Sequence, residues 1–218
     1  MQRRRILQAS AALGSSVLLS ALHAAWAAGG KLPPPGLHRA RGDVRINGRP
    51  ASAGAPVQAG DTITTGADSE AIYIVGNDAW LQRDQSQVTL NGDGLKAGLR
   101  ILQGKLLSVF GKGEKTLNTS TATIGIRGTG CYIEAEAERV YFCLCYGEAE
   151  IVSHRHPEAR ETIRTVHHDR PLYLLANGEK TMVPASVQNH TDAELILLEA
   201  LVGRVPPFYG QAGFSSRY

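Results

Sequence analysis

The sequence predicts an all-β fold, either a sandwich or a β-solenoid of short strands, with one short helix at the C-terminal end. From Val44 onward, runs of roughly four to seven alternating or β-branched residues recur about every 8 to 12 residues. Gly, Asn or Asp bounds each run, which is typical of tight turns, and helical periodicity first occurs after residue 189. A chain of 218 residues that is 43% hydrophobic suits one sizeable domain and excludes collagen-like, disordered and polytopic membrane proteins.

Residues 1–27 have the features of an export signal. Three arginines, Arg3 to Arg5, precede Ile6-Leu7-Gln8 and a mildly apolar stretch, and Ala25-Trp26-Ala27 has the small-x-small pattern of a cleavage site. The paired arginines predict the twin-arginine export route; general secretion and a retained anchor are the alternatives. We expect cleavage after Ala27, a periplasmic or secreted protein, and no membrane span after signal removal.

Three further segments follow the signal. Residues 28–40 are rich in Pro and Gly and predict a spacer, and residues 41–188 contain the predicted strands. Residues 189–218 predict a helix and a tail, because Thr191 and Glu194 form a capping box before leucines at helical spacing. The predicted strands lie near residues 44–46, 61–65, 71–75, 80–82, 88–90, 99–109, 119–126, 131–136, 140–151, 162–166 and 172–175.

Charge argues against a nucleic-acid partner. The formal net charge of +3 comes entirely from Arg3, Arg4 and Arg5, and no run of Lys or Arg follows them. We therefore expect no nucleic-acid partner. The partner we expect is a protein in the cell envelope.

Three segments resemble the FecR domain family. Residues 42–48 with 57–66 resemble its opening strands and G-D-x-I-x-T-G turn, Thr123–Thr129 resembles its T-x-x-x-G-V-R-G-T signature, and Tyr146–Ile151 resembles its closing E-G-x-V-x-V. The resemblance covers residues 42 to about 152. It implies an extracytoplasmic all-β module, best known as the signal-receiving part of regulators that relay siderophore-receptor occupancy to a sigma factor.

This chain departs from those regulators, because it shows neither their cytosolic segment nor their membrane helix. It resembles instead a stand-alone secreted FecR-like protein. We expect a non-enzymatic binding or interaction module in metal-linked or envelope signalling, with iron-transport regulation as the family's usual setting.

The segment around Arg127 predicts a structural role. Gly125 and Gly128 flank this arginine among apolar residues, which suggests a half-buried guanidinium in a strand whose neighbours approach too closely for side chains.

All three cysteines fall in one predicted hairpin. We expect Cys131 to lie opposite Cys143 or Cys145, and all three sulfurs to share the apolar face with Ala149 and Ile151. Three alternatives stay open. Cys131 forms a disulfide with Cys143 or Cys145, the cysteines pack as small apolar residues, or the thiolates bind a metal or haem.

Histidines could supply the remaining ligands of a metal or haem site. Thiolates at x and x+2 with imidazole nitrogens would suit iron, copper, zinc or haem. Adjacent residues of a regular strand point to opposite faces, so we expect at most one of His167 and His168 to bind the metal. His154 and His156 add imidazoles near the hairpin, and the predicted metal ligands are Cys143, Cys145, His167, His168 and His190. No catalytic motif is present in the sequence, and we expect no enzymatic activity.

Overall fold

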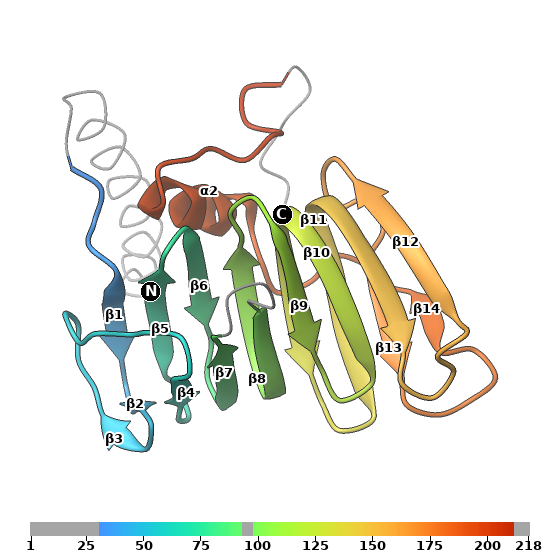
Figure 1. Cartoon of the computed structure of the whole chain (residues 1–218), viewed down its shortest axis with the longest axis horizontal. Helices are drawn as coiled ribbons and strands as arrows, with labels where there is room; N and C mark the ends of the chain where they lie inside the picture. Colours follow the sequence, from blue (N-terminus) through green and yellow to red (C-terminus); the bar gives the residue numbers. More distant parts are fainter. Residues whose placement is uncertain (1–30, 93–97, 212–218) are drawn as a thin grey trace, which may run out of the picture. The chain divides into compact units, whose positions relative to one another are not determined.

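The computed structural model describes residues 31–92 and 98–211 (Figure 1). The predicted signal, residues 1–27, lies outside them. Residues from Pro34 onward belong to one compact unit. Its elements are β1 (Gly36–Arg41), β2 (Val44–Ile46), β3 (Arg49–Pro50), β4 (Thr62–Thr65), β5 (Glu70–Val75), β6 (Asp78–Gln82), β7 (Ser86–Asn91), β8 (Gly98–Val109), β9 (Glu114–Asn118), β10 (Ala122–Ala135), β11 (Arg139–Ser153), β12 (Arg160–Thr165), β13 (Leu172–Leu175), β14 (Met182–Pro184) and α2 (Asp192–Leu201).

The predicted all-β architecture is confirmed. The strands pair in one sheet, antiparallel except for β8 with β9. Three long strands, β8, β10 and β11, pair with one set of strands along their first half and with another set along their second half. For example, β10 pairs with β9 through Thr123–Arg127 and with β8 through Gly130–Ala135. Antiparallel pairing between two such sets fits a sandwich better than a solenoid, whose coils stack in parallel.

Two apolar clusters result from this arrangement. The first lies between the two sets of strands, because it joins side chains of β5 and β6, such as Tyr73 and Trp80, to side chains of β4 and β7, such as Ile63 and Val88. The second lies on the opposite face of β5, β6, β8, β10 and β11, where α2 and Phe208 cover it. We call this the helix-covered face.

The C-terminal helix begins as the sequence predicts. The backbone N–H of Glu194 donates to the Thr191 hydroxyl, the Thr191 N–H donates to the Glu194 carboxylate, and the helix ends at Leu201. Leu195 and Leu198 are fully buried on the helix-covered face. The helix packs across β6 and β8 (Figure 1).

Four strands lie outside the predicted set: β1, β3, β9 and β14. β1 begins at Gly36, inside the segment predicted as a spacer, so the ordered sheet starts before residue 41. Only Leu37 in this strand is a large buried apolar residue, and a register shift between Leu37 and Arg39 interrupts its alternation. Short edge strands carry too few apolar residues to show a period of two.

The buried or half-buried position predicted for the Arg127 guanidinium is wrong. Its side chain is 67% exposed and pairs with Glu114, which is also exposed. A Cβ at Gly125 would meet only the Glu150 carbonyl oxygen, at an ordinary 3.9 Å, so no close approach requires that glycine. Gly128 has φ +55°, and this left-handed conformation, rather than crowding, explains the residue.

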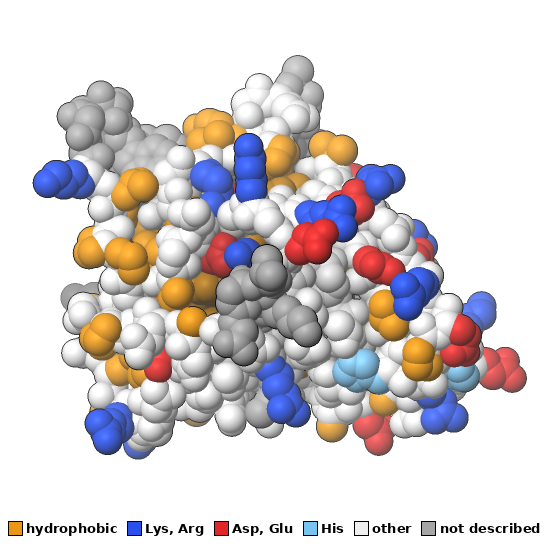
Figure 2. Space-filling model, viewed as in Figure 1, with side chains coloured by type: hydrophobic (Ala, Val, Ile, Leu, Met, Phe, Trp, Pro, Cys, Tyr) orange, Lys and Arg blue, Asp and Glu red, His pale blue; other side chains and the backbone are white. Residues whose placement is uncertain are grey.

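Charged side chains on the outer strands are paired. Figure 2 shows blue and red groups interleaved on the side of the molecule that carries β12. The pairs there include Arg160 with Glu150, and Arg164 with Glu148. Within the described residues, no helix is long and apolar enough to cross a membrane.

Candidate metal centre

The hairpin register separates Cys131 from the other two cysteines. Cys131 lies opposite Leu144, and Tyr132 lies opposite Cys143. The Glu136 N–H donates to the Arg139 carbonyl, so the turn is centred between two residues and pairs odd-numbered with even-numbered positions. The expectation that Cys131 faces another cysteine is therefore wrong. All three cysteines are free thiols, and the disulfide considered above is not formed.

Cys143 and Cys145 point to the helix-covered face, whereas Cys131 points into the sandwich core. The expectation that all three sulfurs share one face with Ala149 and Ile151 is wrong as well, since those residues also face the sandwich core.

The cause is an irregularity in the pairing of β10 with β11 near Gly147. The register of β10 and β11 shifts between Arg127 and Cys131, opposite Gly147. Gly147 has φ +101°, and a Cβ there would come within 2.6 Å of Thr129 Cγ2. Such a bulge changes which alternate residues face inward. It places the two thiols outside the sandwich core and beneath the C-terminal segment.

The loop after β12 brings His168 to the thiols. Asp169 accepts the backbone N–H of Val166 at 2.7 Å, which tightens the loop. His168 then adopts a left-handed backbone conformation, φ +52°, and its N–H donates to the Cys145 carbonyl at 2.9 Å. A left-handed non-glycine residue is costly unless its surroundings hold it. Here the loop and β11 together fix a fully buried imidazole.

The segment before α2 supplies the second imidazole. His190 lies just before the N-cap Thr191, and its ring stacks on Tyr132 with centroids 4.6 Å apart. Its Nδ1 lies 2.7 Å from the Gln188 carbonyl oxygen. Hydrogen bonds and packing with neighbouring residues thus orient the imidazole rings of both His168 and His190.

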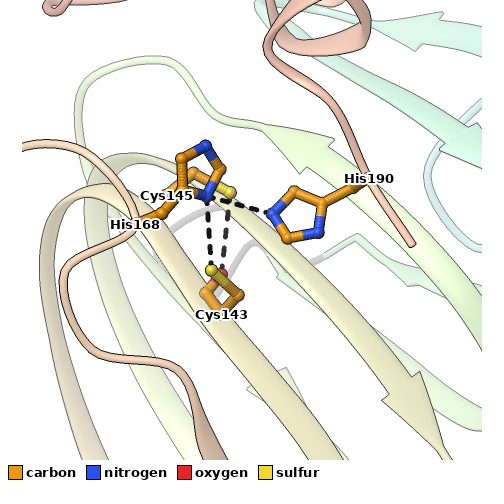
Figure 3. A group of neighbouring side chains, drawn as sticks. All are labelled: Cys143, Cys145, His168 and His190. Atoms are coloured by element: carbon orange, nitrogen blue, oxygen red, sulfur yellow. Dashed lines mark hydrogen bonds between the residues drawn. The ribbon is translucent and has the colours of Figure 1, made fainter. Parts of the chain in front are cut away.

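The sulfur and nitrogen atoms converge. One ligand atom each from Cys143, Cys145, His168 and His190 lies within 4.8 Å of the others, and all four residues are buried (Figure 3). Cys143 Sγ lies 3.4 Å from His168 Nδ1, which lies 3.1 Å from His190 Nε2. Around a tetrahedral zinc ion, metal–ligand bonds of 2.0 to 2.3 Å give separations of about 3.3 Å between nitrogens and about 3.6 Å between nitrogen and sulfur. The two separations are close to these values.

The tautomers of the two histidines follow from their outer partners. The Gln188 carbonyl can only accept, so His190 carries its proton on Nδ1. His168 Nε2 lies 3.1 Å from Asp192 Oδ1 and donates to that carboxylate. In neutral rings the two remaining nitrogens therefore face each other with lone pairs at 3.1 Å. Such an arrangement needs a proton or a cation between them.

The ionisation of the thiols differs sharply. Hydrogen bonds, first from the Cys145 thiol and then with His168 and His190, lower the pKa of Cys143 well below its usual value against the effect of burial. Burial raises the pKa of Cys145. For His168, burial by itself lowers the pKa, and the contacts with Cys143 and Asp192 outweigh it, so that the pKa is raised. Without a metal, both shifts favour a thiolate at Cys143 and a proton on His168.

The remaining candidate histidines take other positions. His167 is not within the four-residue group; its Nε2 lies 2.9 Å from Asp192 Oδ1, and its ring packs against Phe208. His154 contacts Thr123, and His156 contacts Glu158, both on the exposed side of the β domain.

Asp192 is a member of the site that was not predicted from the sequence. An acidic residue directly after an N-cap is common, because it favours the positive end of a helix. Only its complete burial against two imidazoles distinguishes this one.

Comparisons with known proteins give a distant structural similarity. No family model matches the chain, and no curated protein matches its sequence. Two crystal structures of a "putative anti-sigma factor" from Parabacteroides distasonis share 11% sequence identity with it, at TM-scores of 0.49 and 0.48. The aligned region covers 57% of this chain and 59% of that protein.

Proposed function

We propose that this chain is a non-enzymatic metal-binding module, whose Cys143, Cys145, His168 and His190 hold one divalent ion such as zinc. The observation that carries the proposal is the pair of facing imidazole nitrogens. Each ring is fixed by a hydrogen bond on its far side, and both lone pairs converge with two sulfurs in a fully buried place. Closed tetrahedral sites with two sulfur and two nitrogen ligands are typical of zinc.

Charge favours a divalent ion over copper(I). Two thiolates neutralise a divalent ion when both imidazoles are neutral, and burying a site without net charge costs least. Copper(I) would leave the same ligand set with an extra negative charge beside the buried Asp192.

Haem and a two-iron cluster fit the geometry less well. A porphyrin has no space among four ligand atoms that lie within 4.8 Å of one another. In a cluster with two Cys and two His, each type binds a different iron, whereas here Cys143 Sγ and His168 Nδ1 lie 3.4 Å apart.

The contact of the Cys143 thiol with the His168 imidazole also suits a nucleophile, but the burial of both side chains opposes that role. The side chains of Cys143 and His168 are almost inaccessible to solvent. A substrate would have to displace α2 or the C-terminal segment to reach the sulfur.

The FecR resemblance and the export signal suggest where the metal acts. We propose an exported module that binds a protein partner in the cell envelope and takes part in metal-linked signalling. The motif resemblance over residues 42 to about 152 and the paired arginines of residues 1–27 support this part of the proposal.

Metal analysis of three matched variants tests the proposal. Protein purified from its exported form should contain one zinc per chain, with three thiols titratable after denaturation and metal removal. Cys143→Ala and Cys145→Ala should each lose the metal. Cys131→Ala removes an equally buried thiol from the sandwich core and should keep it.

Two results would contradict the proposal. The first is wild-type protein that takes up neither zinc nor cobalt when its thiols are reduced. The second is equal loss of metal from the Cys131→Ala variant, which would indicate a general effect of cysteine removal on folding.

A further inference from the structure

Asp192 is an unusual residue for the first turn of a helix. Its side chain is completely buried, and Oδ1 accepts from His168 Nε2 at 3.1 Å and from His167 Nε2 at 2.9 Å. Its Oδ2 is buried and has no hydrogen-bond partner within the described residues. A buried carboxylate is costly unless donors compensate its charge. Thr191 and Glu194 already cap the helix, so capping does not explain this carboxylate.

We infer that Asp192 is a positioning residue of the proposed metal site, holding His168 with its proton on Nε2 so that the lone pair of Nδ1 points to the metal. This inference rests on the proposed function. Histidines that bind metals commonly donate their other ring N–H to a carboxylate, which fixes the ring and makes it a stronger ligand. His167, with 24% of its side chain exposed, is the second donor to this carboxylate and not a fifth ligand.

The order of contacts supports this assignment. From the thiol outward, Cys143 Sγ faces His168 Nδ1, and the opposite nitrogen of the same ring faces Asp192. The two rings are oriented in different ways, since His190 uses a backbone carbonyl where His168 uses a carboxylate. A side-chain substitution can therefore remove the outer partner of His168 while leaving that of His190 in place.

One competing arrangement uses the same atoms. His167, His168 and Asp192 could hold a second metal ion, because their ligand atoms also lie within 4.8 Å of one another. His168 would then have to lose both ring protons and bridge two ions. The positioning role needs only one of its nitrogens to bind a metal, and we adopt it for that reason.

The decisive variant is Asp192→Asn. An amide of nearly the same size can donate to His168 Nε2, which would move the ring proton to Nδ1 and block the metal. We expect zinc affinity, measured by competition with a chromophoric chelator, to fall 10- to 100-fold. The cobalt-substituted variant should show shifted visible absorption bands at saturation.

Glu194→Gln is the matched control. It makes the same carboxylate-to-amide change in the same helical turn, but Glu194 contacts Thr191 and Arg83 rather than the site histidines. Its zinc affinity should stay within threefold of the wild type. Circular dichroism of both variants monitors folding.

A measurement on the wild type keeps the test independent of variant folding. With bound ¹¹³Cd and ¹⁵N-labelled histidine, NMR should show metal coupling at His168 Nδ1 and a proton on Nε2. Coupling through Nε2, an unchanged affinity in a folded Asp192→Asn variant, or two metal ions per wild-type chain would each overturn the role of Asp192. Wild-type protein that binds no metal would overturn the proposed function itself and this role with it.

Discussion

Replacing Leu198 by Ala should measure how firmly the C-terminal helix is attached to the sheet. Leu198 is fully buried on the helix-covered face with Leu195, Leu107 and Tyr132. The truncation removes about three carbon atoms, worth about 2.4 kcal/mol at about 0.8 kcal/mol for each. An unrelaxed cavity adds about 1 to 2 kcal/mol. We therefore expect the free energy of unfolding to fall by about 3.4 to 4.4 kcal/mol.

The assay is urea denaturation followed by circular dichroism and tryptophan fluorescence. Leu197→Ala is the matched control, because it makes the same change on the same helix at a half-buried position and should cost about 1 to 2 kcal/mol. Equal losses for the two variants, or a loss below 1 kcal/mol for Leu198→Ala, would mean that α2 does not pack as described. His190 and Asp192 would then lose the support that brings them to the thiols.

Three further predictions concern the metal, the surface and export. Chelation of the metal should lower the free energy of unfolding by about 2.7 kcal/mol relative to protein with free zinc at about 100 times its dissociation constant; calorimetry should show a reversible fall in Tm, and no fall would contradict metal-linked stability. Arg127→Ala should change stability by less than about 0.5 kcal/mol, because the pair with Glu114 is exposed on both sides; a loss above 2 kcal/mol in urea denaturation would restore the structural role first predicted. Replacing Arg3 and Arg4 with Lys should leave the precursor in the cytoplasm, whereas the wild type should begin at Ala28 by N-terminal sequencing; a normal periplasmic yield of the Lys form would contradict twin-arginine export.

Local signals were sufficient to predict the C-terminal helix. The capping box at Thr191 and the leucine spacing depend on residues close in sequence, and the structure keeps both. The central strands were predictable for the same reason, since their alternation reflects burial of one face. The edge strands β1, β3 and β14 and the short internal strand β9 have little burial to reveal them.

The members of the candidate site could also be predicted from the sequence, but their arrangement in space could not. The four converging residues all belong to the set chosen for their chemistry, in which His167 was the additional member. The bulge opposite Gly147 could not be inferred, because the inward face changes there without any break in the apolar pattern. Asp192 was missed because a helix start alone explains an acidic residue at that position.

The change of inward face at Gly147 makes the thiol pair and the sandwich core independent of each other. Before Gly147, alternate residues of β11 such as Phe142 and Leu144 fill the sandwich core, while Cys143 and Cys145 turn away from it. Evolution could therefore replace the two cysteines without repacking the sandwich. Related chains with the same strands and the same glycine could lack the proposed metal site, so residues 143 and 145, rather than the β architecture, would be the positions to compare among them.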